Sequence, residues 1–335
     1  MASPGTLALA TRGLGKSYGS RLALDGLDLS VPSGVVYGFL GPNGAGKTTT
    51  MRLLTGLLHP DAGAIELLGS PFTRADRRRL FEVGALVESP SFYPYLSGRA
   101  NLDALAADGA PVPKGRIEEL LDLVGLKERA RDKVSGYSLG MKQRLGIAGS
   151  LLSDPKLLLL DEPANGLDPA GIVAMRETLR HLAASGKTVF VSSHLLAEVQ
   201  VLADVVGIIA RGRLVREGPL ESLLTDQGVV RVRVTRAEAD SARSLLEPIA
   251  PVDATATAGA TPAEGTGDQW LTVHVEPTRA TEVNRALAAA GIYASGLESG
   301  TDLELLFLEL TGGEASSEGR MQGIGDAAGP PAAQG

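Results

Sequence analysis

The chain has 335 residues, enough for two domains of ordinary size, and its 44% hydrophobic and 21% charged residues place it among globular proteins. With 32 basic and 39 acidic residues the formal net charge is −7, which argues against broad nucleic-acid binding because that function usually needs a basic surface. The sequence contains no cysteine, which excludes disulfides, iron–sulfur clusters, zinc–thiolate sites and thiol nucleophiles.

No targeting or membrane-spanning segment is expected. Residues 1–10 lack the basic start and the long apolar stretch of a secretory signal. No apolar run approaches the roughly 18 residues that a membrane-spanning helix needs. A role at a membrane would therefore be that of a peripheral subunit.

Short apolar runs alternate with amphipathic segments as far as about Leu224. The apolar runs predict strands at Leu7–Thr11, Asp28–Val31, Val35–Leu40, Leu157–Leu160, Thr188–Val191 and Val205–Ala210. The amphipathic segments predict helices at Thr48–Leu58, Arg116–Leu126 and Asp168–Ala183. This alternation predicts an α/β fold with a parallel sheet that helices cover on both faces.

A smaller α/β module with the approximate order β-α-β-α is expected over residues 229–311. Alternating patterns predict strands, and amphipathic patterns predict helices, at Val230–Val234, Ala237–Leu246, Leu271–Val275, Pro277–Ala290 and Leu303–Leu310. Residues 254–268 are rich in Ala, Thr and Gly and predict a loop. Residues 312–335 lack periodicity and predict a disordered tail.

A phosphate-binding loop follows the apolar run that ends at Leu40. The octapeptide Gly41-Pro42-Asn43-Gly44-Ala45-Gly46-Lys47-Thr48 matches G-x-x-x-x-G-K-[ST] in full, between a predicted strand and a predicted helix. Glycines let backbone N–H groups surround phosphate oxygens, and the helix directs its positive end at the same anion. Lys47 would contact the β- and γ-phosphates, Thr48 would bind Mg²⁺, and Thr49 completes the predicted ATP contacts.

An acidic pair follows the buried run Leu157–Leu160. Asp161 is predicted to lie in the magnesium shell, and Glu162 to lie near the γ-phosphate, where it would polarise the attacking water. Such a pair is a weak signal alone but a strong one together with the phosphate-binding loop.

Four further motifs resemble those of ABC-type ATPases, in the order of that family. Tyr18 matches the aromatic residue that stacks on adenine, and Tyr137-Ser138-Leu139-Gly140-Met141-Lys142-Gln143-Arg144 resembles the ABC signature. Asn165-Gly166-Leu167-Asp168 resembles the D-loop, and His194 in Ser192-Ser193-His194 resembles the switch histidine. The resemblance covers residues 6 to about 224 and implies an ATPase domain over 1–224, with a helical subdomain at about 90–155.

The resemblance also implies how this machine is assembled. Two ATPase domains would face each other head to tail, so that ATP bound at Lys47 of one copy meets Ser138 and Gly140 of a second copy or a paralogue. His194 would contact the γ-phosphate. The partner would be a transmembrane permease, with the ATPase at the cytoplasmic face of the membrane.

One position departs from the family pattern. Glu88 stands where the family usually has a glutamine that contacts Mg²⁺ and lies against the permease, so Glu88 is a candidate for both the metal and the nucleotide site. Together with the form of the signature and the C-terminal module, this glutamate resembles exporters of the bacitracin, lantibiotic and daunorubicin resistance type. A purely structural carboxylate at Glu88 is the alternative.

Two other functions are possible for a chain with these motifs, and the sequence disfavours both. A soluble, non-transport ABC ATPase of translation or DNA repair would carry two cassettes, a long coiled coil or zinc–cysteine modules, and the sequence predicts none of these. A regulatory or assembly module that binds ATP without turnover is disfavoured by the intact Lys47, Asp161, Glu162 and His194.

Overall fold

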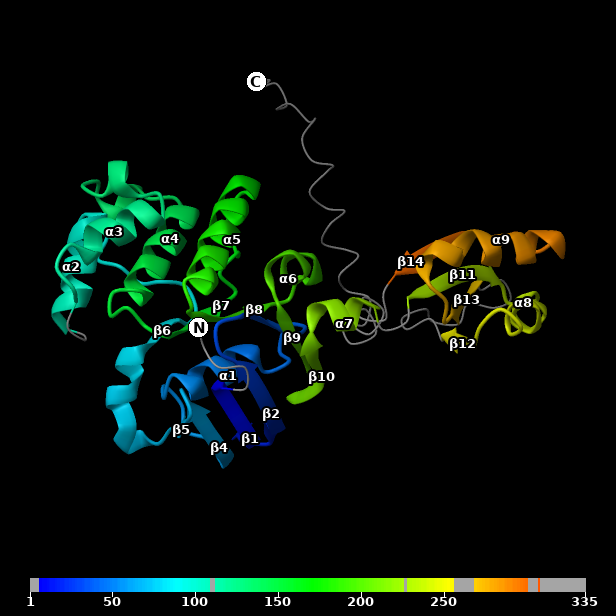
Figure 1. Cartoon of the computed structure of the whole chain (residues 1–335), viewed down its shortest axis with the longest axis horizontal. Coiled ribbons are helices and arrows are strands. Elements are labelled where there is room, and N and C mark those ends of the chain that lie inside the picture. Colours follow the sequence, from blue (N-terminus) through cyan, green and yellow to red (C-terminus); the bar gives the residue numbers. More distant parts are fainter. Residues whose placement is uncertain (1–5, 109–111, 226–227, 256–267, 301–306, 308–335) are drawn as a thin grey trace, which may run out of the picture. The chain divides into compact units, whose positions relative to one another are not determined.

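The computed structural model describes residues 6–108, 112–225, 228–255, 268–300 and residue 307. It divides into two compact units, Met1–Glu221 and Ser222–Gly335 (Figure 1). Within the described residues, no helix is both long and apolar enough to cross a membrane.

The first unit is built around a six-stranded sheet in the order β10-β9-β3-β8-β7-β6. Strands β9, β3, β8, β7 and β6 pair in parallel, as predicted, and β10 joins the edge antiparallel to β9. The strands are β3 Val36–Leu40, β6 Val83–Leu86, β7 Leu157–Asp161, β8 Thr188–Ser193, β9 Val205–Ala210 and β10 Arg213–Pro219.

A second, antiparallel sheet in this unit was not predicted. It has the order β2-β1-β4-β5, with β1 Leu7–Tyr18, β2 Arg21–Pro32, β4 Ala62–Leu67 and β5 Ser70–Pro71. The two N-terminal strands are longer than predicted and belong to this sheet. Buried and exposed residues alternate along parts of both strands, as expected for a sheet with one solvated face, whereas β7 is buried along its whole length.

Alternate residues of β7 enter two separate cores. Leu157 and Leu159 pack in the core between the two sheets, together with Met51 of the first helix. Leu158 and Leu160 pack in the core beneath the helices on the opposite face, whose members include Leu145. The helices are α1 Lys47–Leu54, α2 Gly98–Asp108, α3 Arg116–Leu123, α4 Leu139–Ser150, α5 Pro169–Ala184 and α6 Leu196–Leu202, and α7 Leu220–Thr225 spans the boundary between the two units.

Helices α1 and α3 end earlier than predicted, each two residues before a glycine with positive φ. Gly56 has φ 70° and Gly125 has φ 66°, a left-handed conformation that glycine adopts without a steric penalty. After α3, the N–H of Leu126 donates to Leu121 O at 2.8 Å, which closes a Schellman motif. Apolar residues after these glycines continue the amphipathic pattern, so the sequence predicts helix ends that lie too far along the chain.

The second unit has one more strand at each end of its sheet than the predicted β-α-β-α order. Its order along the chain is β11 Val229–Thr235, α8 Ala239–Leu246, β12 Val252–Thr255, β13 Asp268–Val273, α9 Ala280–Ala289 and β14 Gly296–Gly300. All pairings are antiparallel, and the strand order β12-β13-β11-β14 is that of a ferredoxin-like β-α-β-β-α-β unit. Residues 254, 255 and 268, predicted as loop, belong to strands: 254 and 255 pair with β13 across the hairpin, and 268 pairs with Thr235 of β11.

The remaining predictions for this unit lie mostly outside the described residues. Within the predicted helix Leu303–Leu310, only Phe307 is described, and it is buried. The central part of the predicted loop and the predicted tail at 312–335 lie outside the described residues altogether.

Candidate active site

The phosphate-binding loop connects β3 to α1 and depends on glycine at a specific position. Gly46 is the residue immediately before α1 and has φ 116°. A Cβ atom there would lie 2.7 Å from Leu24 Cδ2 and 2.9 Å from Ala23 O. Only glycine avoids both the strained dihedral and this contact, so the close approach of the loop to β2 requires it.

A cavity of about 380 Å³ opens beside this loop. Nine predicted site residues line it, namely Tyr18, Asn43, Gly44, Gly46, Lys47, Thr48, Thr49, Glu162 and His194. Arg21 and Ala23 also line it and were not predicted, and Asn165, which was assigned to the D-loop motif but not to the nucleotide site, lines it too. The position of Arg21 could have been found from the short hairpin in which it pairs with Tyr18, and Asn165 from its place in the D-loop motif.

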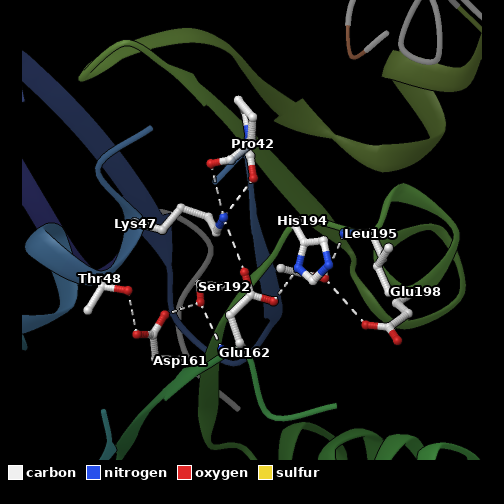
Figure 2. A network of polar contacts seen from close by, with 11 residues as sticks. Pro42, Lys47, Thr48, Asp161, Glu162, Ser192, His194, Leu195 and Glu198 are labelled. Carbon is white, nitrogen blue, oxygen red and sulfur yellow. Dashed lines mark hydrogen bonds and ion pairs between the residues drawn. The ribbon is translucent and has the colours of Figure 1, made fainter. Parts of the chain in front are cut away.

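Lys47 is buried at the mouth of the loop and binds three oxygen atoms. Its Nζ donates to Gly41 O at 2.7 Å and to Pro42 O at 3.3 Å, and lies 3.1 Å from Glu162 Oε1. Figure 2 shows these contacts converging on the ammonium group. The backbone carbonyls orient the lysine, and the carboxylate balances its charge while the side chain is only 6% exposed.

Glu162 links Lys47 to His194. Its Oε2 lies 2.8 Å from His194 Nδ1, and its backbone N–H donates to Ser192 Oγ at 3.0 Å (Figure 2). Glu162 has a φ of 47°, an uncommon conformation for a residue other than glycine, which here turns the chain sharply after β7. The side chain therefore reaches two basic groups that come from distant parts of the sequence.

The electrostatics of this pair favour its charged forms. Burial raises the pKa of Glu162, but the hydrogen bond with His194 and the charge of Lys47 outweigh it, so the pKa lies below the ordinary value. The hydrogen bond to Glu162 raises the pKa of His194, against the opposing effect of burial. Glu162 is thus an ionised carboxylate near neutral pH, as a group that polarises water must be.

Thr48 and Asp161 are in direct contact beneath the cavity. Thr48 Oγ1 donates to Asp161 Oδ2 at 2.8 Å, while the hydroxyl of Ser192 donates to Asp161 Oδ1. The pair supplies only oxygen atoms, the donors that Mg²⁺ prefers. Ser192, which the sequence reasoning placed only in the switch motif, orients the carboxylate and the turn at Glu162.

Glu88 does not contact Thr48 or Asp161 in this structure. Its Oε1 accepts a hydrogen bond from Arg52 Nη2 on α1, and Glu88 does not line the cavity. Its φ of 67° is again left-handed. A metal-binding role for Glu88 therefore remains a prediction.

The signature residues form the start of helix α4, away from the cavity of the same chain. Ser138 is the N-cap, and its Oγ accepts a hydrogen bond from the Met141 N–H at 3.2 Å. Neither Ser138 nor Gly140 lines the cavity. Because a helix N-terminus attracts anions, this end of α4 is suited to meeting a phosphate from outside its own chain.

Comparison with known proteins gives the family. The profile described as "ABC transporter" matches residues 24–165. The bacitracin transport ATP-binding protein BcrA of Bacillus licheniformis is 47% identical over 216 residues, which cover 64% of this chain and 71% of that protein. The lantibiotic transport ATP-binding protein SrtF of Streptococcus pyogenes is 44% identical over 209 residues, covering 62% and 90%.

The chain belongs to the ABC transporter ATP-binding proteins. A solved ATP-binding subunit of an ABC transporter matches it with a TM-score of 0.58 and 30% identity, covering 65% of this chain and 92% of that one. This ABC ATPase binds nucleotide and hydrolyses ATP to power transport. The transport relatives favour this function over a non-transport ABC ATPase or a regulatory module without turnover.

Proposed function

We propose that this ABC ATPase powers the export of a drug, antibiotic or peptide through a separate transmembrane permease, at the cytoplasmic face of the membrane. The observation that carries the proposal is the complete triad of Lys47, Glu162 and His194 around a cavity large enough for a nucleotide. Its relatives BcrA and SrtF are named for bacitracin and lantibiotic transport, which supports this class of cargo.

Within the cavity, each residue has a defined task. Lys47 holds the β- and γ-phosphates, and Glu162 orients and polarises the attacking water, while His194 contacts the γ-phosphate. Because Lys47 and His194 both contact Glu162 in the structure, an entering triphosphate competes with this carboxylate for the same two groups. Nucleotide binding thereby frees Glu162 for its role as base.

Mg²⁺ would be held by Thr48 and Asp161, whose oxygens already lie 2.8 Å apart. Among the described residues, no group of three or more His, Asp or Glu is arranged to hold a metal by itself. In phosphate sites Mg²⁺ takes one or two protein carboxylates together with the phosphates. When bound, the ion would neutralise phosphate charge.

A second ATPase domain, either another copy or a paralogue, would complete each site. Ser138 and Gly140 would reach the γ-phosphate across the dimer interface. The support is that both lie at a helix N-terminus and do not line the cavity of their own chain.

Glu88 would link the nucleotide state to the permease. The adjoining segment 89–96 carries two exposed aromatic rings, Tyr93 at 54% and Tyr95 at 65% exposure, with their centroids 5.8 Å apart. Exposed aromatic pairs are typical of protein-binding surfaces. The alternative is that Glu88 is a structural carboxylate held by Arg52.

The C-terminal module would assist assembly or regulation. Its described residues form a self-contained sheet with its own core and no phosphate-binding loop, and its boundary with the ATPase domain is proposed near residue 224.

The deciding experiment is reconstitution with the permease. The ATPase should co-purify with a multi-span membrane protein, and cells carrying both should resist a drug or peptide antibiotic. Glu162→Gln should abolish resistance without releasing the ATPase from the permease. If the intact pair gave no resistance to, and no transport of, any drug, antibiotic or peptide tested, the export proposal would fail.

The role of Glu88 needs a separate comparison in the same cells. Glu88→Ala should bind ATP almost normally yet confer little resistance, and Glu88→Gln should be partly active. Full resistance with Glu88→Ala would leave only the structural interpretation.

A further inference from the structure

Three carboxylates gather at one edge of the central sheet. Strands β6 and β7 run in parallel, with Leu86 opposite Leu160. Glu88 therefore leaves the sheet at the same edge as Asp161 and Glu162. An anionic triphosphate that binds beside this edge meets three negative charges, which repel it unless they are compensated.

Each of these carboxylates has a partner on helix α1. Glu162 pairs with Lys47, Asp161 accepts from Thr48, and Glu88 pairs with a third α1 residue. The first two partners belong to the phosphate-binding motif. The third, Arg52, belongs to no motif.

Arg52 is placed to act on the nucleotide site. It follows Thr48 by four residues, so the two side chains lie on one face of α1, one turn apart. The pKa of Arg52 is raised, mainly by its hydrogen bond with Glu88 and to a smaller extent by Tyr18, which lines the nucleotide cavity. Arg52 thus contacts Glu88 and is close enough to Tyr18, the residue predicted to stack on adenine, to be influenced by it electrostatically.

We propose that Arg52 is a positioning residue of the nucleotide site, which compensates the charge of Glu88 and keeps that carboxylate from repelling the γ-phosphate. The inference rests on nucleotide binding, and it does not depend on coupling to a permease. It explains how this chain accommodates a negatively charged glutamate at position 88, where a neutral side chain would not repel the phosphate. Arg52 and Glu88 have to act as a pair.

The competing interpretation is an ordinary surface ion pair. The side chains of Arg52 and Glu88 are 39% and 53% exposed, and exposed pairs usually contribute little to stability. A pair of that kind would leave nucleotide affinity unchanged when it is broken. The two interpretations therefore differ in nucleotide binding, and stability cannot separate them.

The test is a double-mutant cycle on the full chain, read by calorimetric titration with ATP and with ADP. Arg52→Gln, Glu88→Gln, the double variant and Arg52→Lys are titrated first in EDTA, then with MgCl₂ and a non-hydrolysable ATP analogue. Arg99→Gln is the matched control, because Arg99 forms a comparable ion pair with Glu118 at 46% and 52% exposure.

Arg52→Gln should weaken ATP binding about fivefold and ADP binding clearly less, because only ATP carries the γ-phosphate. The double variant should recover to within about twofold of wild type, and Arg52→Lys should bind as wild type does because it keeps the charge. The ATP effect should be present in EDTA, since it does not pass through the metal.

Several results would overturn the proposal. These are equal losses for ATP and ADP, no recovery in the double variant, or the same loss in Arg99→Gln. If Arg52→Gln does not fold, Glu88→Gln alone decides, because it should tighten ATP more than ADP. No permease is present in these titrations, so failure of the export proposal would not alter their outcome.

Discussion

Replacing Glu162 by glutamine tests the most specific feature of the site, which is one carboxylate shared by Lys47 and His194. Removal of a general base typically costs 10²–10⁴ in rate, so we expect turnover to fall about 10³-fold. ATP binding should become tighter, because the γ-phosphate no longer competes with a carboxylate for the two basic groups. The variant should therefore accumulate as an ATP-bound dimer.

The size of the affinity gain follows from the geometry of the Lys47–Glu162 pair. The two charged groups lie 3.1 Å apart and are only 6% and 18% exposed. Breaking such a pair costs more than breaking an exposed one, about 0–1 kcal/mol, and less than removing one partner of a fully buried pair, about 3–5 kcal/mol, which leaves a buried charge unpaired. An intermediate value of about 1.4 kcal/mol corresponds to roughly tenfold tighter ATP binding.

Two assays separate the effects on rate and affinity. Phosphate release with Mg²⁺ gives kcat, and calorimetric titration with ATP in EDTA gives the dissociation constant without hydrolysis. Glu128→Gln, the same substitution at an exposed position, is the control and should change neither. Near-wild-type turnover in Glu162→Gln would show that another group is the base, and unchanged ATP affinity would show that the carboxylate does not compete with the nucleotide.

Three further predictions concern stability and domain organisation. The pKa of His194 is raised in the folded protein. Its contact with Glu162 therefore contributes its full stabilisation of the folded state below about pH 6.5, and this contribution is lost as the pH rises through the folded pKa. The difference in Tm between wild type and His194→Gln should thus shrink from pH 6 to pH 9. Glu162 stays charged over this whole range because its pKa is lowered. A Tm difference that does not change with pH would contradict the assignment. Gly46→Ala should cost about 1–3 kcal/mol in urea unfolding and abolish ATP binding, whereas Gly186→Ala, also at positive φ but with open space around it, should retain binding. A chain ending at Thr225 should bind ATP with wild-type affinity, and loss of binding by a protein that is folded by circular dichroism would assign the C-terminal module a role in the site.

Local sequence patterns were sufficient wherever the chemistry is carried by neighbouring residues. The loop from Gly41 to Thr48 is recognisable because phosphate binding itself requires its glycines and its lysine at that spacing. The continuous apolar run of β7 predicted burial on both faces, and the structure confirms it. A strand buried on both sides must be apolar at every position, so its sequence reveals its place in the sheet.

Strand partners depended on the tertiary structure. The N-terminal strands joined an antiparallel sheet, and the C-terminal module gained β12 and β14, because pairing comes from long-range register and not from local periodicity. The motifs indicated Lys47, Glu162 and His194 separately, but their convergence required the folded sheet. The Arg52–Glu88 pair joins residues 36 positions apart and has no sequence signature, because only the packing of α1 against the sheet edge brings the two charges together.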